Sequence, residues 1–320
     1  MVTLQAMREA QERLRGIIKP TPLQSSQTFS KMTGAEIFLK PESLQKAGSF
    51  KLRPAYNVLS SLSPQERARG LITYSAGNWA QGVALAASML EVKATVVMPE
   101  AAPKVKVQAT QGYGAEVILY GTNSVELLTK AQQIELEREY FFLDRLGMTE
   151  GIIGNATIGL EIMAEMPDVD AIVAPVGGGS LFAGIAAGAK AVNHRVQMIG
   201  VQPIGANAMK LSLETGRVVE IDSVATIADG LAVKRPSEFV FHLIKDLIDE
   251  IVLVSDDDIV GATLLLLERA KLLVEPSGAT ALAGVISGKV NVRGKKVAVV
   301  LSGGNLDPKR LATFLMSGSI

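Results

Sequence analysis

Short runs of apolar, mostly β-branched residues alternate along this chain with longer segments of helical period. The runs are GLITY, ATVVM, AEVILY, AIVAP, MIGV and KKVAVVL, and the segments between them include 78–90, 124–138 and 181–192. Strands that are apolar on both faces and separated by helices are typical of a parallel sheet covered by helices. The pattern therefore predicts an α/β protein with open, mostly parallel sheets.

The length of 320 residues is about twice that of a typical domain, which favours two domains. Hydrophobic residues make up 48% and charged residues 20%, so the chain can bury a full core. No Pro- or Ser-rich linker separates two halves. We therefore expect a second domain to be inserted into the first rather than appended to it.

Composition excludes several classes of function. Lys plus Arg equals Asp plus Glu at 32 each, which predicts no attraction to nucleic acid or to an anionic membrane. The absence of cysteine excludes disulfides, thiolate metal sites and cysteine nucleophiles. The two histidines, His194 and His242, are too few for a three-histidine zinc centre, and no HExxH occurs. We expect no metal site.

Neither of two candidate segments predicts export or membrane insertion. The first residues, MVTLQAMREAQERLRGI, lack the apolar region of a signal peptide, so we expect a cytoplasmic protein. The charge-free stretch 171–189 is long enough to cross a bilayer, but Pro175 and the glycines after it would break a spanning helix. A strand, a glycine loop and a helix explain this stretch better.

Three glycine-containing turns each follow a predicted strand and precede a helix. They are Ser75-Ala76-Gly77-Asn78, Gly177-Gly178-Gly179-Ser180 and Ser302-Gly303-Gly304-Asn305. Ligands bind at the carboxyl ends of parallel strands, where glycine lets backbone N–H groups converge on an anion at a helix N-terminus. The turns therefore predict a phosphate site.

The second turn fits neither of two common phosphate motifs. Counted from Gly177, the third small residue of GxGxxG is replaced by Phe182. The P-loop spacing from Gly179 reaches Gly184, but Ile185 and Ala186 follow where Lys and Ser or Thr are required. A dinucleotide fingerprint and a P-loop are both excluded.

Lys51, in the segment GSFKLRPA, would be a solvated surface residue if nothing else were considered. An enzyme with a phosphate site but no metal ligand and no cysteine still needs an electrophile, and pyridoxal phosphate supplies one through a lysine Schiff base. A different class also fits these residues, namely a non-catalytic α/β protein that binds a phosphorylated ligand with the same turns. The residues alone leave both open.

Six sets of residues together resemble the fold-type II pyridoxal-phosphate enzymes, and within them the threonine dehydratase and serine racemase group. In chain order they are Gly48-Ser49-Phe50-Lys51, Ser75-Ala76-Gly77-Asn78 with Ala80-Gln81-Gly82, Pro175-Val176-Gly177-Gly178-Gly179, Ile227-Ala228-Asp229-Gly230, Glu275-Pro276 and Ser302-Gly303-Gly304-Asn305. The resemblance extends from about residue 20 to residue 307.

The resemblance implies roles for individual residues. Lys51 would form the Schiff base with pyridoxal phosphate and remove the substrate's Cα proton, while Phe50 packs against the ring. Asn78 would bond the ring hydroxyl, and Ser302 would face the ring nitrogen. The phosphate would be held by Gly177, Gly178, Gly179, Ser180 and Leu181, with Gly230 and Glu275 near the cofactor. The substrate carboxylate would be bound by Ser75, Ala76, Gly77, Asn78 and Trp79.

Ser302 and Ala76 favour one reaction within the group. A neutral hydroxyl at the ring nitrogen does not stabilise a pyridinium, so charge at Cα is better discharged by expelling a β-substituent. The expected reaction is β-elimination from a β-hydroxy amino acid, giving 2-oxobutanoate and ammonia from L-threonine and pyruvate from L-serine. Racemases of the group resemble Ser-Ser-Gly-Asn here, but Ala76 has no proton to give.

Alternatives within the group are a serine or other amino-acid racemase and a dehydratase of another hydroxy amino acid such as 3-hydroxyaspartate. Gln202 and Ala208 stand where the group often has two metal-binding acids, so we expect that metal site to be absent. Most relatives have histidine in place of Trp79, glycine in place of Ser180, a His-Pro-Phe-Asp or similar segment in place of residues 142–145, and Gly-Gln-Gly-Thr in place of residues 154–157. The indole of Trp79 would either pack in its helix or shape the side-chain pocket.

The resemblance also implies a domain division. A large domain, residues 1–65 and 143–320, would hold pyridoxal phosphate. A smaller mobile domain, residues 66–142, would carry the Asn78 loop and close over the substrate, excluding water. Homodimers or larger homo-oligomers are usual in the group, so we expect one here.

Overall fold

A computed structural model describes residues 2–144 and 148–316 of the chain. The strands are β1 Gln24–Ser25, β2 Glu36–Lys40, β3 Leu71–Tyr74, β4 Ala94–Met98, β5 Glu116–Leu119, β6 Phe141–Phe142, β7 Ala171–Pro175, β8 Gln197–Pro203, β9 Glu250–Val254 and β10 Lys296–Val300. The helices are α1 Leu4–Leu14, α2 Gln27–Thr33, α3 Leu52–Ser61, α4 Pro64–Arg69, α5 Asn78–Met89, α6 Lys104–Gly112, α7 Ser124–Arg138, α8 Thr149–Glu165, α9 Ser180–Val192, α10 Ala208–Thr215, α11 Glu238–Lys245, α12 Asp256–Leu265, α13 Pro276–Ile286 and α14 Pro308–Met316. Short helical turns lie at η1 Glu42–Leu44, η2 Lys46–Gly48, η3 Ile204–Ala206, η4 Asp229–Leu231 and η5 Leu266–Ala270.

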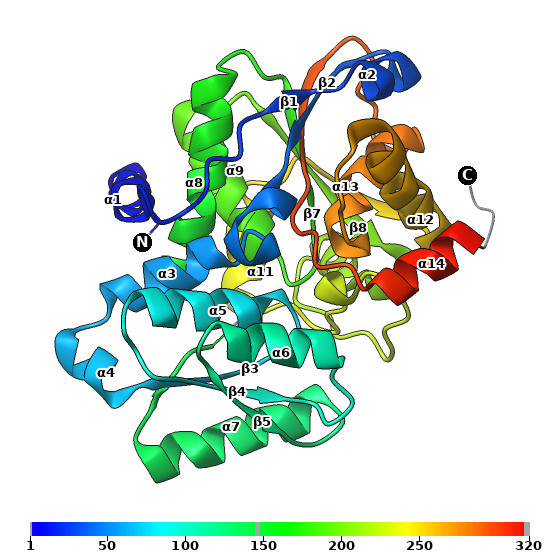
Figure 1. The fold of residues 1–320 in the computed structure, drawn as a ribbon. Coiled ribbons are helices and arrows are strands. Elements are labelled where there is room, and N and C mark those ends of the chain that lie inside the picture. Colours follow the sequence, from blue (N-terminus) through cyan, green and yellow to red (C-terminus); the bar gives the residue numbers. More distant parts are fainter. Residues whose placement is uncertain (1, 145–147, 317–320) are drawn as a thin grey trace.

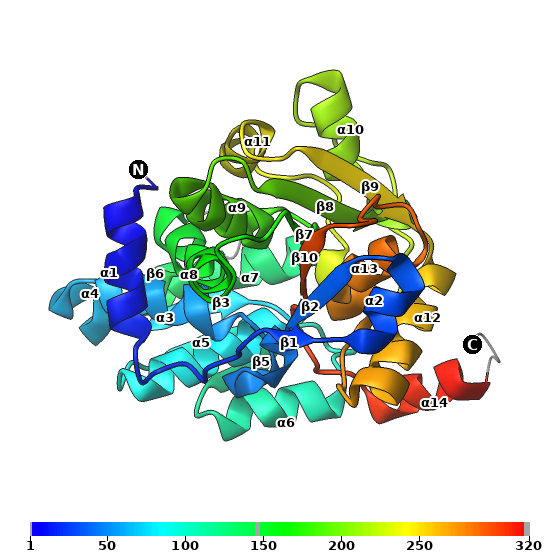
Figure 2. The same ribbon diagram turned by 90° about the horizontal axis from the view of Figure 1, so that it is seen from above.

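The larger sheet has six strands in the order β1-β2-β10-β7-β8-β9. Its pairings are parallel, except that β1 runs antiparallel to β2. Helices α8 and α9 cover one face, and α2, α12 and α13 cover the other (Figures 1 and 2). This burial on both faces is the reason why the strand sequences read as continuous apolar runs rather than as an alternation.

The two faces of the larger sheet contribute to separate cores. In β10, Val297 and Val299 join the core built with α12 and α13, whereas Ala298 and Val300 join the core built with α8 and α9. This is the period-two alternation of a strand, with every position apolar. The arrangement holds the carboxyl ends of β7 and β10 next to each other, because these strands are neighbours.

The smaller sheet has four parallel strands in the order β5-β4-β3-β6. Its core on one side joins Leu71 and Val96 to residues of α3 and α5, and on the other side Ile72 and Val97 pack against α7. Helices α3 and α5 lie between the two sheets (Figure 1). All four strands lie within residues 66–142, the part of the chain that we predicted to form a mobile domain. Its mobility stays a prediction.

The predicted fold class is confirmed, and all six apolar runs contain strands. The sequence analysis did not identify β1 and β6, which have two residues each, or β2 and β9, which each begin with an exposed glutamate. The three glycine turns follow β3, β7 and β10, so they come from two sheets rather than one. The charge-free stretch 171–189 forms β7, a turn and most of α9, as predicted.

In residues 2–144 and 148–316, no helix is both long and apolar enough to cross a membrane. Within the same residues, no three His, Asp or Glu side chains gather into a cluster that could hold a metal ion. The acidic triplet after Ser255 instead caps a helix: Ser255 and Asp258 form a reciprocal capping box at the start of α12.

Arg53 is fully buried between two carboxylates that come from distant parts of the chain. Its Nε and Nη2 donate to Glu42 at 2.8 Å each, and its Nη1 and Nη2 donate to Glu161 at 2.5 and 2.9 Å. Lys40 also donates to Glu161, at 2.7 Å. The guanidinium thus joins α3 to η1 and to α8. Arg53 stands two residues after Lys51 in the chain.

The charges in this cluster support one another. Burial disfavours the charged form of Arg53, but Glu42 and Glu161 outweigh it and hold the pKa of the guanidinium above its ordinary value. Burial alone would raise the pKa of Glu161, but Arg53 and Lys40 outweigh it and hold that pKa below its ordinary value. Removing the guanidinium would therefore leave the buried Glu42 without its cationic partner and Glu161 with Lys40 alone.

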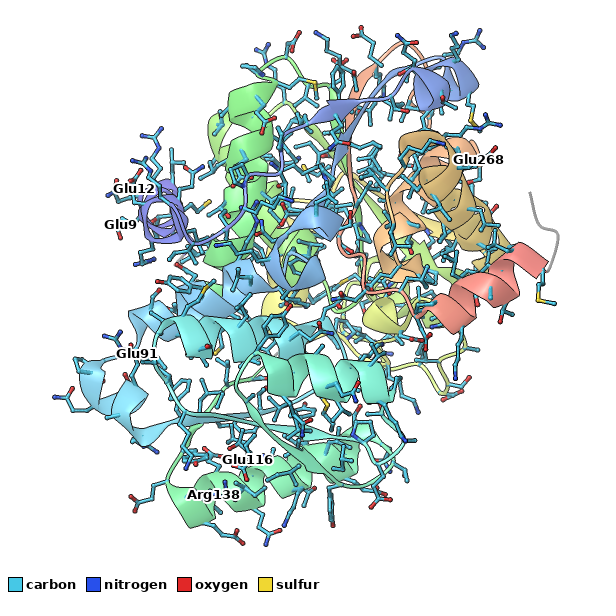
Figure 3. The ribbon with its side chains drawn as sticks, in the orientation of Figure 1. Glu9, Glu12, Glu91, Glu116, Arg138 and Glu268 are labelled. Atoms are coloured by element: carbon cyan, nitrogen blue, oxygen red, sulfur yellow. The ribbon has the colours of Figure 1, made fainter. Side chains whose placement is uncertain are left out.

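We expect the substitution Arg53→Met to lower the free energy of unfolding by about 3–5 kcal/mol, measured by urea denaturation, because the buried Glu42 loses its cationic partner and Glu161 keeps only Lys40. The matched control is Arg138→Met, which breaks the exposed ion pair between Arg138 and Glu116 on α7 and β5 (Figure 3). The control should cost less than about 1 kcal/mol. Equal losses in the two variants would contradict the importance of the buried cluster.

Candidate active site

The backbone around Lys51 is fixed against the third glycine turn. Ser49 forms an antiparallel bridge with Gly303, and the Phe50 N–H donates to the Ser302 carbonyl at 3.1 Å. Lys51 is the first residue before α3 and already has helical backbone angles. The lysine therefore leaves the edge of the larger sheet and begins the helix that lies between the sheets.

Helix α5 approaches Lys51 closely at Gly82. A Cβ at Gly82 would lie 2.8 Å from both the carbonyl carbon and the Cβ of Lys51, a separation that side chains do not tolerate. This glycine belongs to the Ala80-Gln81-Gly82 segment on which the resemblance was based. It allows the helix that follows the first turn to pack directly on the lysine.

Lys51 lines a pocket with an empty volume of about 330 Å³. Its Nζ lies 4.5 Å from the centre of the Phe50 ring and 5.8 Å from that of Trp79, both within the range of a cation–π contact. The other lining residues are Pro54, Val58, Trp79, Asp144, Met148, Gly151, Ile152, Asn155 and Ser180. A larger hollow beside α1, of about 940 Å³, contains none of the predicted site residues.

The second turn places a helix N-terminus beside this pocket. Gly179 has φ +94°, in the left-handed region, and a Cβ there would lie 2.4 Å from Ile244 Cδ1. A Cβ at Gly177 would lie 2.9 Å from the Leu231 Cα and 3.3 Å from the Gly230 carbonyl oxygen. Gly179 is the N-cap of α9 and has no side chain. No side-chain oxygen at the cap therefore accepts from the first backbone N–H groups of this helix.

The predicted residues Asn78 and Glu275 contact each other across the two sheets. Asn78 Nδ2 donates to Glu275 Oε1 at 2.5 Å, and Asn78 Oδ1 accepts from Asn305 Nδ2 at 2.8 Å. Although part of Glu275 reaches the surface, burial of its carboxyl group raises the pKa, and the bond from Asn78 opposes that shift only in part. The first turn is thereby tied to the third.

Ser302 is buried at the end of β10, where its hydroxyl donates weakly to the Ser277 carbonyl at 3.4 Å. Ser277 Oγ in turn accepts from the Gly230 N–H at 2.8 Å. Gly230 is exposed and lies against Gly177. These contacts join the predicted residues of the second and third turns and of η4 into one region.

The structure brings some of the predicted residues together directly and leaves others at its edge. Lys51, Trp79 and Ser180 share the pocket, and Phe50 and Leu181 share one apolar core. The half-buried residues Ala76, Gly77 and Gly178 line no part of that pocket. Ser75 is buried and accepts from the Gly77 N–H at 3.2 Å, which shapes the first turn.

Trp79 takes both of the roles that its sequence position suggested. Its Nε1 donates to Thr73 Oγ1 at 3.0 Å and its ring belongs to the core of the smaller sheet. The same ring lines the Lys51 pocket.

Gln202, at the position of the group's metal ligand, accepts from the Lys210 N–H through Oε1 at 3.1 Å, and Ala208 is buried at the start of α10.

Sequence reasoning did not assign a role to Asn155 or Asp144, which both line the pocket. The signal was present, because both fall in segments where the chain differs from the group's usual residues. Asn155 replaces the Gln of Gly-Gln-Gly-Thr. Residues 142–145, FLDR, replace a His-Pro-Phe-Asp segment; Arg145, the last of them, lies outside the described residues. Arg53 lies in the segment GSFKLRPA beside Lys51, but the sequence assigned it no role.

Curated proteins of known activity resemble the chain over its full length. L-Threonine ammonia-lyase of Thermotoga maritima is 44% identical over 320 residues, which is 100% of this chain and 80% of the relative. L-threo-3-Hydroxyaspartate ammonia-lyase of Saccharomyces cerevisiae is 38% identical over 310 residues, covering 97% and 95% of the two chains.

A solved structure agrees with this result. Maize serine racemase superimposes with a TM-score of 0.94 at 32% identity, covering 99% of this chain and 97% of the other. The pattern of the pyridoxal-phosphate dependent enzyme family matches residues 14–303. Since that match includes Lys51, the first two glycine turns and the first two residues of the third, the chain belongs to the family of pyridoxal-phosphate dependent enzymes.

Proposed function

We propose that the protein is an L-threonine ammonia-lyase, which converts L-threonine to 2-oxobutanoate and ammonia and also L-serine to pyruvate and ammonia. The observation that carries this proposal is the single pocket that holds Lys51 beside the N-terminus of α9, in a chain that resembles a threonine ammonia-lyase from end to end. The cofactor is pyridoxal phosphate.

The residues of the site fit this cofactor. The turn before α9 consists of glycines, so it has no side chain that would fill the space of a phosphate. Neighbouring residues enclose Gly177 and Gly179 so closely that a Cβ at either position would clash. N–H groups at a helix start bind phosphate well. The amine of Lys51 lies in the adjacent pocket with an aromatic ring on each of two sides.

When bound, pyridoxal phosphate supplies an aldehyde that condenses with amines and a ring that withdraws electrons from the substrate's Cα. Lys51 holds the cofactor through its Nζ and, when released by the substrate's amine, takes the proton from Cα. Phe50 limits the movement of the lysine side chain, because its ring lies 4.5 Å from Nζ. The backbone N–H groups of residues 177–181 hold the phosphate.

Asn78 and Ser302 orient the ring in this proposal. Asn78 Nδ2 carries two N–H groups, one of which donates to Glu275, and the other is the donor for the ring hydroxyl. Ser302 offers a neutral hydroxyl to the ring nitrogen and thus does not favour a protonated ring. Elimination of the β-hydroxyl is then favoured over reactions that need a long-lived Cα anion.

The first turn binds the substrate's carboxylate. Gly77 caps α5 without a side-chain hydrogen bond, so the N–H groups of the first turn of the helix are suited to an anion. The strand before this turn belongs to the smaller sheet, whereas Lys51 starts from the larger one. Movement of residues 66–142 toward the larger domain would complete the site and exclude water.

The pocket favours an uncharged substrate side chain. Pro54, Val58 and Ile152 give it an apolar wall, and Asp144 adds a carboxylate. A second carboxylate on the substrate, as in 3-hydroxyaspartate, would lose its hydration against this apolar wall. The site therefore supports threonine and serine better than 3-hydroxyaspartate, the substrate in the name of the yeast relative.

Racemisation is the second candidate activity, because the maize structure is that of a serine racemase. Racemisation needs a proton donor on the face of Cα opposite the lysine. Ala76 stands where the resemblance implies that donor, and its methyl group cannot supply a proton.

We also propose, from the resemblance to the group alone, that the enzyme acts in the cytoplasm as a homo-oligomer.

We expect the purified enzyme to release 2-oxobutanoate and ammonia in equal amounts from L-threonine, and pyruvate from L-serine. The assay measures both products and analyses the recovered substrate by chiral chromatography, with 3-hydroxyaspartate included for comparison. The recovered amino acid should remain the L enantiomer. Accumulation of the D enantiomer faster than that of the oxo acid would contradict the proposal.

The variant Ala76→Ser is the matched control for this assay. It restores a hydroxyl at the position of the group's second serine, so we expect D-serine to form from L-serine while oxo acid is still released. This result shows that the assay detects racemisation in this chain. A wild-type enzyme that racemises as fast as the variant would favour the racemase alternative.

We expect the carboxyl group of Glu275 to make stability depend on pH. Its pKa is raised in the folded protein, so protonation stabilises the fold at low pH, and this stabilisation is lost as pH rises through the folded-state pKa. The variant Glu275→Gln lacks this loss. Without bound cofactor, the melting temperature of the variant relative to wild type should therefore increase from about pH 5 to about pH 8. A difference in melting temperature between the variant and wild type that does not change with pH would contradict this account.

A further inference from the structure

Asn155, on the pocket-facing helix α8, has one unmet polar atom. The residue is 2% exposed, and its Nδ2 donates to the Ser180 carbonyl at 3.1 Å. Its Oδ1 is buried, and no described group of the protein, Lys51 included, donates a hydrogen bond to it. Buried amide oxygens in folded proteins have partners in the great majority of cases, so this atom calls for an explanation.

The orientation of this amide is fixed by its surroundings. Reversing it would place the amide oxygen against the Ser180 carbonyl, and two acceptors would then face each other. Helix α9 also packs directly on the base of the side chain, since a Cβ at Gly184 would lie 2.5 Å from the Asn155 Cβ. Asn155 Oδ1 is therefore a rigid acceptor in the wall of the pocket.

Besides Asn155 itself, three side chains with donors line the pocket, namely those of Lys51, Trp79 and Ser180, and none of them donates to this oxygen. The Trp79 indole N–H is already donated to Thr73, and Asp144 is a carboxylate, which accepts. The remaining walls include Pro54, Val58 and Ile152, which have no side-chain donor. Among the described residues this oxygen has no donor, so a molecule that enters the pocket is able to supply one.

We propose that Asn155 is a specificity-determining residue, whose Oδ1 accepts a hydrogen bond from the β-hydroxyl of the amino-acid substrate. This inference rests on the proposed ammonia-lyase function and names the group that the pocket recognises. The α-amine and α-carboxylate are engaged elsewhere, so the β-hydroxyl is the donor left on serine or threonine. As the leaving hydroxyl takes up a proton, its O–H groups become stronger donors, and the bond to Oδ1 strengthens.

The test compares two substrates that differ in one group. L-Serine carries a β-hydroxyl, whereas β-chloro-L-alanine has the same skeleton with a leaving group that cannot donate. The variant Asn155→Leu keeps the shape of the side chain and removes the acceptor. We expect its kcat/KM for L-serine and L-threonine to fall about tenfold more than its kcat/KM for β-chloro-L-alanine, whatever loss is common to all three substrates.

A merely structural role predicts a different result, in which all three substrates lose activity by the same factor. That outcome would overturn the proposal. Because Asn155→Leu also loses the bond to Ser180 and could fail to fold, a second pair of variants is measured. Asn155→Gln and Asn155→Met have equal lengths and differ in the amide, so the Gln variant should prefer L-serine over β-chloro-L-alanine more than the Met variant does. Equal preferences would again overturn the proposal.

The wild-type enzyme separates this proposal from the proposed function. If wild type releases no oxo acid from L-threonine or L-serine, the function itself is wrong, and the inference that rests on it is wrong as well. Suppose instead that wild type is active, but that Asn155→Leu has the substrate preference of wild type and Asn155→Gln has that of Asn155→Met. The function then stands and the proposed role of Asn155 is wrong.

Discussion

The buried ion cluster around Arg53 sets the geometry on which the proposed site depends. The guanidinium holds α3 against η1 on one side and α8 on the other, through Glu42 and Glu161. A Cβ at Gly154 would lie 2.8 Å from the Arg53 carbonyl oxygen, so α8 meets α3 at backbone distance. Lys51 begins α3 and Asn155 follows Gly154, so one contact sets the position of the reactive amine relative to the pocket wall.

Close contacts between backbones at glycines connect this region to the rest of the fold. Gly82 brings α5 to Lys51, Gly184 brings α9 to Asn155, and Gly303 leaves space for Glu275 beside Asn78. The Gly303 contact spans the two sheets, whereas the Gly82 and Gly184 contacts each join two helices of one layer. The chemistry is thus held between two sheets, with the amine anchored to the larger sheet and the carboxylate-binding turn attached to the smaller one.

Much of this arrangement could be predicted from local patterns. Apolar runs that are buried on both faces identified the strands at β3, β7 and β10, and glycines after them marked the turns. The Arg53 cluster could not be predicted, because Glu42 and Glu161 lie more than a third of the chain apart and look like ordinary surface acids in sequence. Asn155 was recognisable as a departure from the group's pattern, but its unmet oxygen depends on how α8 packs against α9.

The central claim is that one amine, the Nζ of Lys51, carries the cofactor. The most direct measurement is borohydride reduction of the purified yellow holoenzyme, followed by proteolysis and mass spectrometry of the labelled peptide. We predict that the reduced pyridoxyl group is recovered on Lys51 and that the Lys51→Ala variant retains neither label nor turnover. Recovery of the label on another lysine, or undiminished turnover in the variant, would contradict the account.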